Sequence, residues 1–206
     1  MSSESYQLCV RSVIGKRTGR ASTTSLDARS IQRAVEESER VTRLMPERDD
    51  LLALPDAQHY EDVRDAHDAE TAGLSAEMRA ELAARMIDAA ASHSLTAAGI
   101  VRSVEGDVGE YGERGTLALG NSNGLFAYHR STKLQLTTTV MGPDSSGWAD
   151  AASHRASDLD ADAVGRLAVE KALASATPHS VPPGDYTVIL EPAAVAELLA
   201  FLVPEF

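Results

Sequence analysis

The sequence is poor in the residues that form covalent or metal cross-links. Among its 206 residues there is one cysteine, Cys9. A single thiol cannot form an intramolecular disulfide, and it cannot build a metal cluster by itself. Because Cys9 lies in the strand-like run YQLCV, we expect it to be a small hydrophobic residue of the core.

Basic residues are also scarce. The chain has 31 acidic and 19 basic residues, which give a formal charge of -12 and a pI near 4.9. Proteins bind a phosphate backbone through clustered lysines and arginines. The one dense basic stretch, residues 11–20, is expected to form the solvated edge of a β-hairpin. The composition therefore predicts no nucleic-acid partner.

Long apolar runs are missing as well. The longest are far shorter than the roughly 20 residues that a membrane-spanning helix needs. Met1 leads into the polar run SSESYQ, without the basic and then apolar segments of a secretory signal. These absences predict no membrane association and a cytoplasmic location.

What remains is the composition of an ordinary globular protein. Hydrophobic residues make up 43% and charged residues 24% of the chain, which is long enough to bury a core. Strand-like and helix-like segments alternate in blocks. This pattern predicts an α+β fold in which antiparallel strands are packed on one side by helices.

The first part of the chain, residues 1–46, is predicted to be a hairpin followed by a helix. Apolar and polar residues alternate over residues 6–24 on either side of a glycine-containing turn. Asp27 is the expected N-cap, and Pro46 ends the helix. The expected apolar face of the helix consists of Ile31, Ala34, Val35, Val41 and Leu44. Residues 47–74 are acidic and form a predicted linker.

Residues 75–206 are predicted to continue with a helix, a β-meander, a helix, a strand and a last helix. The first helix runs from Ser75 to about His93, with Met78, Leu82, Met86 and Ile87 on one face. Three strand-like runs within residues 98–140 indicate an antiparallel meander. Further elements are a helix over residues 164–174, a buried strand over residues 186–190 and a helix that starts at Pro192.

One short motif matches the nucleophile motif of serine hydrolases. Residues 120–124, GNSNG, satisfy the G-x-S-x-G pattern of a nucleophile elbow. An elbow needs a helix after it, whereas the residues that follow alternate as a strand, so a hairpin turn is favoured. The competing hypothesis makes Ser122 the nucleophile, with His129 or His154 as the base and an aspartate to orient it.

Other candidate sites are weaker. Asp158, Asp160 and Asp162 begin like a calcium loop, but Ala163 and Val169 stand where that loop needs glycine and glutamate, so a capped helix is predicted. The six histidines form no His-Glu-x-x-His pair, and His67 and Glu70 are expected to be a surface pair. The residues predict no catalytic, cofactor-binding or metal-binding site in this chain.

Three segments carry a family resemblance: residues 120–125 (GNSNGL), Gly147-Trp148, and residues 183–199 (PGDYTVILEPAAVAELL). They resemble TldD/PmbA proteins, once called modulators of DNA gyrase, on the PmbA (TldE) side. The resemblance implies an incomplete N-terminal domain of the family over residues 1–206. It also implies that the chain is truncated at both ends and lacks the family's β-rich C-terminal domain.

The resemblance also implies a function. TldD-type and TldE-type subunits form a zinc-dependent peptidase that degrades small unfolded peptides in the cytoplasm. The zinc motif, His-Glu-x-x-x-His, belongs to the TldD type, whereas the matching helix here is EPAAVAELLAF and has no histidine. We therefore expect a non-catalytic subunit with a TldD-like partner, a peptide substrate, no cofactor of its own and zinc in the partner. A catalytically silent interaction module is the remaining alternative.

Overall fold

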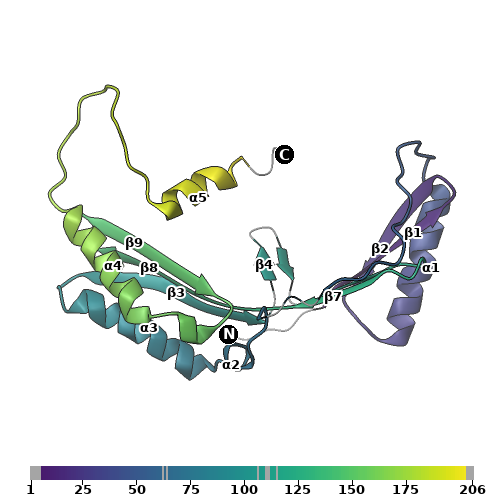
Figure 1. The fold of residues 1–206 in the computed structure, drawn as a ribbon, viewed down its shortest axis with the longest axis horizontal. Helices are drawn as coiled ribbons and strands as arrows, with labels where there is room; N and C mark the ends of the chain where they lie inside the picture. Colours follow the sequence, from purple (N-terminus) through teal and green to yellow (C-terminus); the bar gives the residue numbers. More distant parts are fainter. Residues whose placement is uncertain are drawn as a thin grey trace.

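The structure is a computed structural model that describes residues 6–61, 63, 65–105, 107–109, 112–114 and 116–202. Figure 1 shows an elongated molecule with a hairpin and helix at one end and a helix-covered sheet at the other. The elements are β1 (Leu8–Ile14), β2 (Arg17–Thr23), α1 (Ala28–Leu44), α2 (Ala69–Ala72), α3 (Ala76–Ala91), β3 (Thr96–Glu105), β4 (Asp107–Gly109), β5 (Gly112–Arg114), β6 (Thr116–Gly120), β7 (Phe126–Arg130), β8 (Thr132–Met141), β9 (Ser146–Ser153), the short 3-10 helix η1 (Ala156–Asp158), α4 (Ala161–Ala174) and α5 (Pro192–Ala200). No described helix is long and apolar enough to span a membrane.

The predicted hairpin and helix are confirmed as β1, β2 and α1. Asp27 caps α1 by accepting a hydrogen bond from the Ser30 amide at 3.0 Å. The predicted inner face is confirmed only at Ala34. The other buried residues of α1 are Ser30, Ser38 and Thr42, whereas the predicted Leu44 is 70% exposed. Cys9 is likewise exposed rather than in the core.

Small residues face the hairpin because helix and strands approach closely there. The hydroxyls of Ser38 and Ser12 lie 2.6 Å apart, and Thr42 donates its hydroxyl to the Ser38 carbonyl at 2.7 Å. A Cβ at Gly19 would lie 2.6 Å from the Thr42 backbone nitrogen. Bulkier side chains would separate α1 from β2, so this face of the helix carries hydroxyls and alanine instead of leucines.

The main core lies between a three-stranded antiparallel sheet, in the order β3-β8-β9, and helices α3 and α4 on one face of it (Figure 1). Alternate residues of β8 point into this core, including Leu134, Leu136 and Val140, all fully buried. The predicted α+β class, with helices on one side of antiparallel strands, is confirmed.

The strands of the predicted meander do not all pair with their neighbours in the sequence. β3 pairs with β8 and β6 pairs with β7, while β4 and β5 form a separate two-stranded hairpin. Thus β7 pairs with β6, and the next strand, β8, pairs with β3. Most of this region therefore forms one long ribbon. The segment that begins near Trp148 forms the edge strand β9.

Glycines set the close packing of α4 in this core. A Cβ at Gly147 on β9 would lie 2.7 Å from the Lys171 Cβ and inside van der Waals distance of the α4 backbone. A Cβ at Gly165 would lie 3.0 Å from the Ala89 Cβ of α3. Within the Gly147-Trp148 pair noticed in the sequence, Gly147 therefore has a packing role, because β9 and α4 touch there without an intervening side chain.

The C-terminal part differs from the prediction. Residues 186–190 form no strand and are exposed, with Val188 at 69% and Ile189 at 98%. An isolated extended segment has no partner for its backbone groups, so apolar character alone does not make it a strand. The helix predicted from Pro192 is confirmed as α5, with proline in its first turn, but none of its residues is buried.

Candidate functional site

The GNSNG motif forms the turn between β6 and β7. Gly124 has φ +87°, and the Asn121 side chain accepts hydrogen bonds from the amides of Asn123 and Leu125 at 3.0 and 3.1 Å. Gly124 occupies a conformation that glycine adopts without strain. The turn predicted from the sequence is confirmed, and β7 follows it where a nucleophile elbow requires a helix.

The Ser122 hypothesis therefore finds no support in the geometry. Ser122 is exposed in the turn, and within the described chain no side chain hydrogen-bonds to its hydroxyl. His129 lies along β7 opposite Leu117, while His154 follows β9 and contacts the Thr132 carbonyl through Nδ1 at 2.6 Å. The structure does not bring the proposed nucleophile and either base together.

His154 belongs instead to a partly buried polar network that fastens α2 to the sheet. The Thr132 hydroxyl accepts from the Asp68 amide at 2.9 Å and donates to the His154 carbonyl at 2.8 Å. Thr71 donates its hydroxyl to the Asp68 carboxylate at 2.6 Å and accepts from the Ala156 amide at 2.7 Å. These bonds satisfy buried groups and position the chain, which is a structural role.

The acidic candidates also have structural partners. Asp160 caps α4, and Arg85 of α3 forms ion pairs with both Asp160 and Asp162. A hydrogen bond from Arg85 lowers the pKa of the Asp162 carboxyl. The predicted capped helix is confirmed, and these aspartates hold α3 against the start of α4.

His67 pairs with a residue far away in sequence rather than with Glu70. Its Nε2 lies 3.2 Å from Glu105 Oε1, and Arg130 contacts the same carboxylate. The hydrogen bond from Arg130, followed by the one from His67, lowers the pKa of Glu105. This cluster joins the end of β3 to β7 and to the segment before α2. Among the described residues, no group of three or more His, Cys, Asp and Glu side chains is placed to hold a metal ion.

The Asn turn rests on the segment that follows α1, which we call the strap, residues 47–57. Asn121 Nδ2 donates to the Pro55 carbonyl at 2.7 Å, and Asn123 Nδ2 donates to the Leu54 carbonyl at 3.2 Å. At its other end the Arg48 amide donates to the Lys16 carbonyl at 2.9 Å. The strap thus ties the β6–β7 turn to the β1–β2 hairpin.

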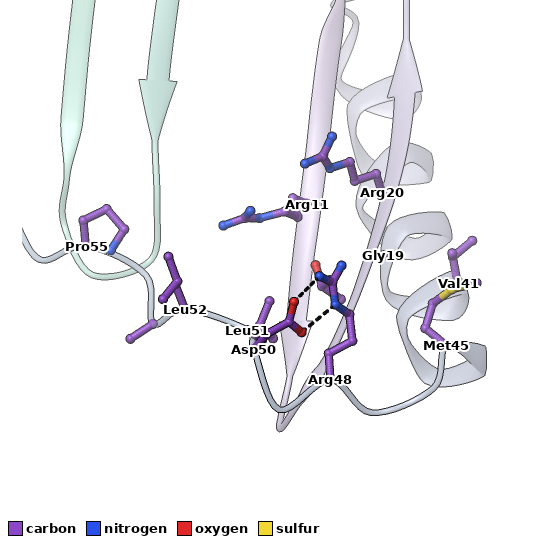
Figure 2. A pocket seen from close by; sticks show the side chains of 12 residues that line it. Arg11, Gly19, Arg20, Val41, Met45, Arg48, Asp50, Leu51, Leu52 and Pro55 are labelled. Atoms are coloured by element: carbon purple, nitrogen blue, oxygen red, sulfur yellow. Dashed lines mark hydrogen bonds and ion pairs between the residues drawn. The ribbon is translucent and has the colours of Figure 1, made fainter. Parts of the chain in front are cut away.

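Between the strap and the hairpin lies a cavity of about 630 Å³, which we call the arginine cavity (Figure 2). Arg11, Arg20 and Arg48 line it together with apolar residues of the strap. Figure 2 shows Arg11 extending from β1 toward Leu52 and Pro55, and Arg48 paired with Asp50. From the sequence, Arg11 and Arg20 were expected on a solvated hairpin edge and Arg48 in the linker. The only available signal was that Arg11 and Arg20 are equidistant from the hairpin turn.

The segment that carries the family resemblance near the C-terminus is joined to α4 by an ion pair. Glu191, the N-cap residue of α5, pairs with Lys171 Nζ of α4 at 2.7 Å, and the same ammonium donates to the Trp148 carbonyl at 3.0 Å. Beyond that ion pair α5 exposes its apolar side chains, with Leu198 at 57% and Leu199 at 52%.

Comparison with known proteins places these features in a family context. A family model described as the PmbA/TldA metallopeptidase central domain matches residues 69–176, from α2 to just past α4. None of the curated proteins matches the sequence.

Three similar crystal structures share the fold. A proposed modulator of DNA gyrase from Bacteroides thetaiotaomicron has a TM-score of 0.74 and 19% identity, over 96% of this chain and 46% of that one. A proposed modulator from Thermotoga maritima has a TM-score of 0.68 and 15% identity, over 87% and 40%. TldE from Thermococcus kodakarensis has a TM-score of 0.64 and 18% identity, over 81% and 37%. The chain therefore spans less than half the length of each of these structures.

Proposed function

Because the chain belongs to the PmbA/TldD family of metallopeptidases, we propose that it acts as a non-catalytic subunit of the PmbA (TldE) type. Its partner is a TldD-like subunit that carries the zinc, and the pair cleaves small unfolded peptides in the cytoplasm. The observation that carries this proposal is the sequence of α5, which the resemblance matches to the family's zinc-binding helix and which contains no histidine.

The donor set of α5 does not fit a peptidase zinc. Zinc in peptidases is held by histidine nitrogens and a carboxylate, with one position left for water. The helix and its cap offer only Glu191 and Glu197, and Glu191 is already paired with Lys171. We therefore assign the zinc to the partner.

The exposed apolar surface of the C-terminal part supports a partner. Soluble proteins rarely expose a continuous apolar patch unless it forms an interface. Here the exposed residues extend from the segment before α5 through the helix and beyond it: Val188, Ile189, Leu190, Val195, Leu198, Leu199, Phe201 and Leu202. We propose that this surface packs on apolar residues of the TldD-like subunit.

The test is reconstitution. The purified chain, a TldD-like protein and zinc are incubated separately and together with an unfolded peptide, and cleavage is followed by mass spectrometry. We expect cleavage in the mixture and none from this chain alone. Robust cleavage by the chain alone overturns the proposal, and association without cleavage favours the interaction module.

A pair of variants tests the proposed interface. Leu198→Asp places a charge in the exposed surface of α5 and is expected to weaken association with the partner at least tenfold in native mass spectrometry. Ile87→Asp is the matched control, because Ile87 is 50% exposed on α3, away from α5. Equal effects of the two substitutions would place the interface elsewhere.

A further inference from the structure

The arginine cavity places two positive charges directly opposite one another. In the β1–β2 register Arg11 faces Arg20, so their side chains leave the same face of the hairpin. Like charges at directly opposite positions destabilise an antiparallel pair. The chain carries a formal charge of -12, so acidic residues are plentiful. Among the described residues, however, none forms an ion pair with Arg11 or Arg20.

The neighbouring basic residues differ in having acidic partners. Lys16 pairs with Asp49 at 2.6 Å, Arg17 with Glu47 at 3.4 Å, and Arg48 with Asp50 at 2.6 Å. Within the part of the chain that the structure describes, neither the Arg11 nor the Arg20 side chain has a hydrogen bond or an ion pair. Their ten N–H donors are therefore available to a ligand.

A third polar group in the cavity also lacks a partner. The Thr18 hydroxyl is buried and makes no hydrogen bond, the one such side-chain atom among the described residues. Thr18 lines the cavity and lies two residues before Arg20, on the same face of β2. A buried hydroxyl without a partner is costly, and it can both donate to and accept from a bound oxyanion.

The remaining residues of the lining indicate what kind of group the ligand carries beside its charge. The strap contributes Leu51, Leu52, Ala53 and Pro55, and α1 with its C-cap contributes Val41 and Met45. The lining also includes the carboxylate of Asp50, which is paired with Arg48 at 2.6 Å. The described lining has aliphatic side chains and methionine but no aromatic ring on which a nucleotide base would stack. Its volume of about 630 Å³ is in the usual range for a small-molecule site.

From this juxtaposition we propose that the arginine cavity binds a carboxylate carried on a short aliphatic body, such as the C-terminal end of a small apolar peptide. Arg11 and Arg20 hold the carboxylate between their planar guanidinium groups, which suit it geometrically. Thr18 completes the polar contacts, and the aliphatic body lies against the strap. This site is independent of the proposed zinc-peptidase role, because it involves neither α5 nor a metal.

The experiment uses the full chain and four probes. N-acetyl-leucine represents a peptide end, isovalerate a free short-chain acid, N-acetyl-leucine amide lacks the carboxylate, and inorganic phosphate tests a general anion site. Binding is measured by isothermal titration and by amide shifts of Thr18, Arg20 and Leu52 in NMR spectra. We expect N-acetyl-leucine to bind at least tenfold more tightly than the amide or phosphate. Isovalerate binding as tightly as N-acetyl-leucine points to a free acid as the source of the carboxylate.

Variants separate recognition from folding. Arg11→Gln and Arg20→Gln should each weaken N-acetyl-leucine binding at least tenfold while raising the melting temperature of the free protein, because each removes the like-charge pair. Arg29→Gln on α1 removes the same charge outside the cavity and should leave binding unchanged. Equal binding of the acid and its amide, or tight binding by both hairpin variants, would overturn the proposal.

Discussion

Replacing Gly147 with alanine tests the packing of α4 on the sheet. The new Cβ would lie 2.7 Å from the Lys171 Cβ, whereas carbon atoms in favourable contact are about 3.5 Å apart or more. The Ala168 carbonyl oxygen and the Ala172 backbone nitrogen lie nearer still. Two of these three neighbours are backbone atoms of a helix, so a rotamer change cannot relieve the overlap and α4 must move outward.

The expected cost follows from two opposing effects. Overpacking a core costs about 1–3 kcal/mol, and the backbone contacts at Gly147 favour the upper end of that range. Alanine also restricts the unfolded chain, which returns about 0.7 kcal/mol. The net loss of about 2 kcal/mol corresponds to a melting temperature lower by about 4–8 °C for a chain of this size.

Thermal unfolding followed by circular dichroism measures this effect. Gly120→Ala is the matched control, because Gly120 also lies in a strand and its added Cβ would meet its nearest neighbour, the Leu125 carbonyl oxygen, at an ordinary 3.6 Å. We expect the control to leave the melting temperature unchanged or slightly higher. If the two variants melt together, close approach of β9 and α4 is not what requires glycine at position 147.

Three further predictions concern other parts of the molecule. Thr132→Val removes the buried hydroxyl that bonds to the Asp68 amide and the His154 carbonyl and should cost about 1–3 kcal/mol in urea unfolding, whereas Thr137→Val, on the opposite face of β8, should have little effect. Asn121→Ala should free the strap and speed its cleavage in limited proteolysis, while Ser122→Ala leaves the rate unchanged and a fluorophosphonate probe does not label the wild-type serine. Hydrogen bonds from Ser25 and Ser30 lower the pKa of Asp27, so its folded-state pKa lies below its unfolded value of about 3.9. Its stabilisation is therefore complete above that pH and is lost as the pH falls, and the difference in unfolding midpoint between wild type and Asp27→Ala should shrink below about pH 4.

Local chemistry explains why much of the secondary structure could be predicted. Asp27 begins α1 and Pro46 lies just past its end, Ser75 begins α3, and Pro192 lies in the first turn of α5. Each of these signals acts through the residue itself or through neighbours a few positions away. The Asn121 turn belongs to the same class, because its side chain bonds to amides two and four residues on.

Features that depend on distant neighbours were missed. The residues of α1 that face the hairpin are Ser30, Ala34, Ser38 and Thr42, a pattern that hydrophobic periodicity does not detect. The like charges of Arg11 and Arg20 form a candidate binding site only when the strap lies across the hairpin and encloses the cavity. Neither the close helix contact nor the cavity has a signature within a short window of sequence.

The sequence by itself determined the α+β class, most helix boundaries, the hairpin turns and, through the absence of histidine from residues 192–202, the lack of the zinc motif. Only the tertiary structure decided that β3 pairs with β8, and that Tyr186–Leu190 is an exposed segment instead of a strand. Caps and turns act over a few residues, so they can be recognised locally. Strand pairing and burial require partners from elsewhere in the chain, and those partners exist only once the chain has folded.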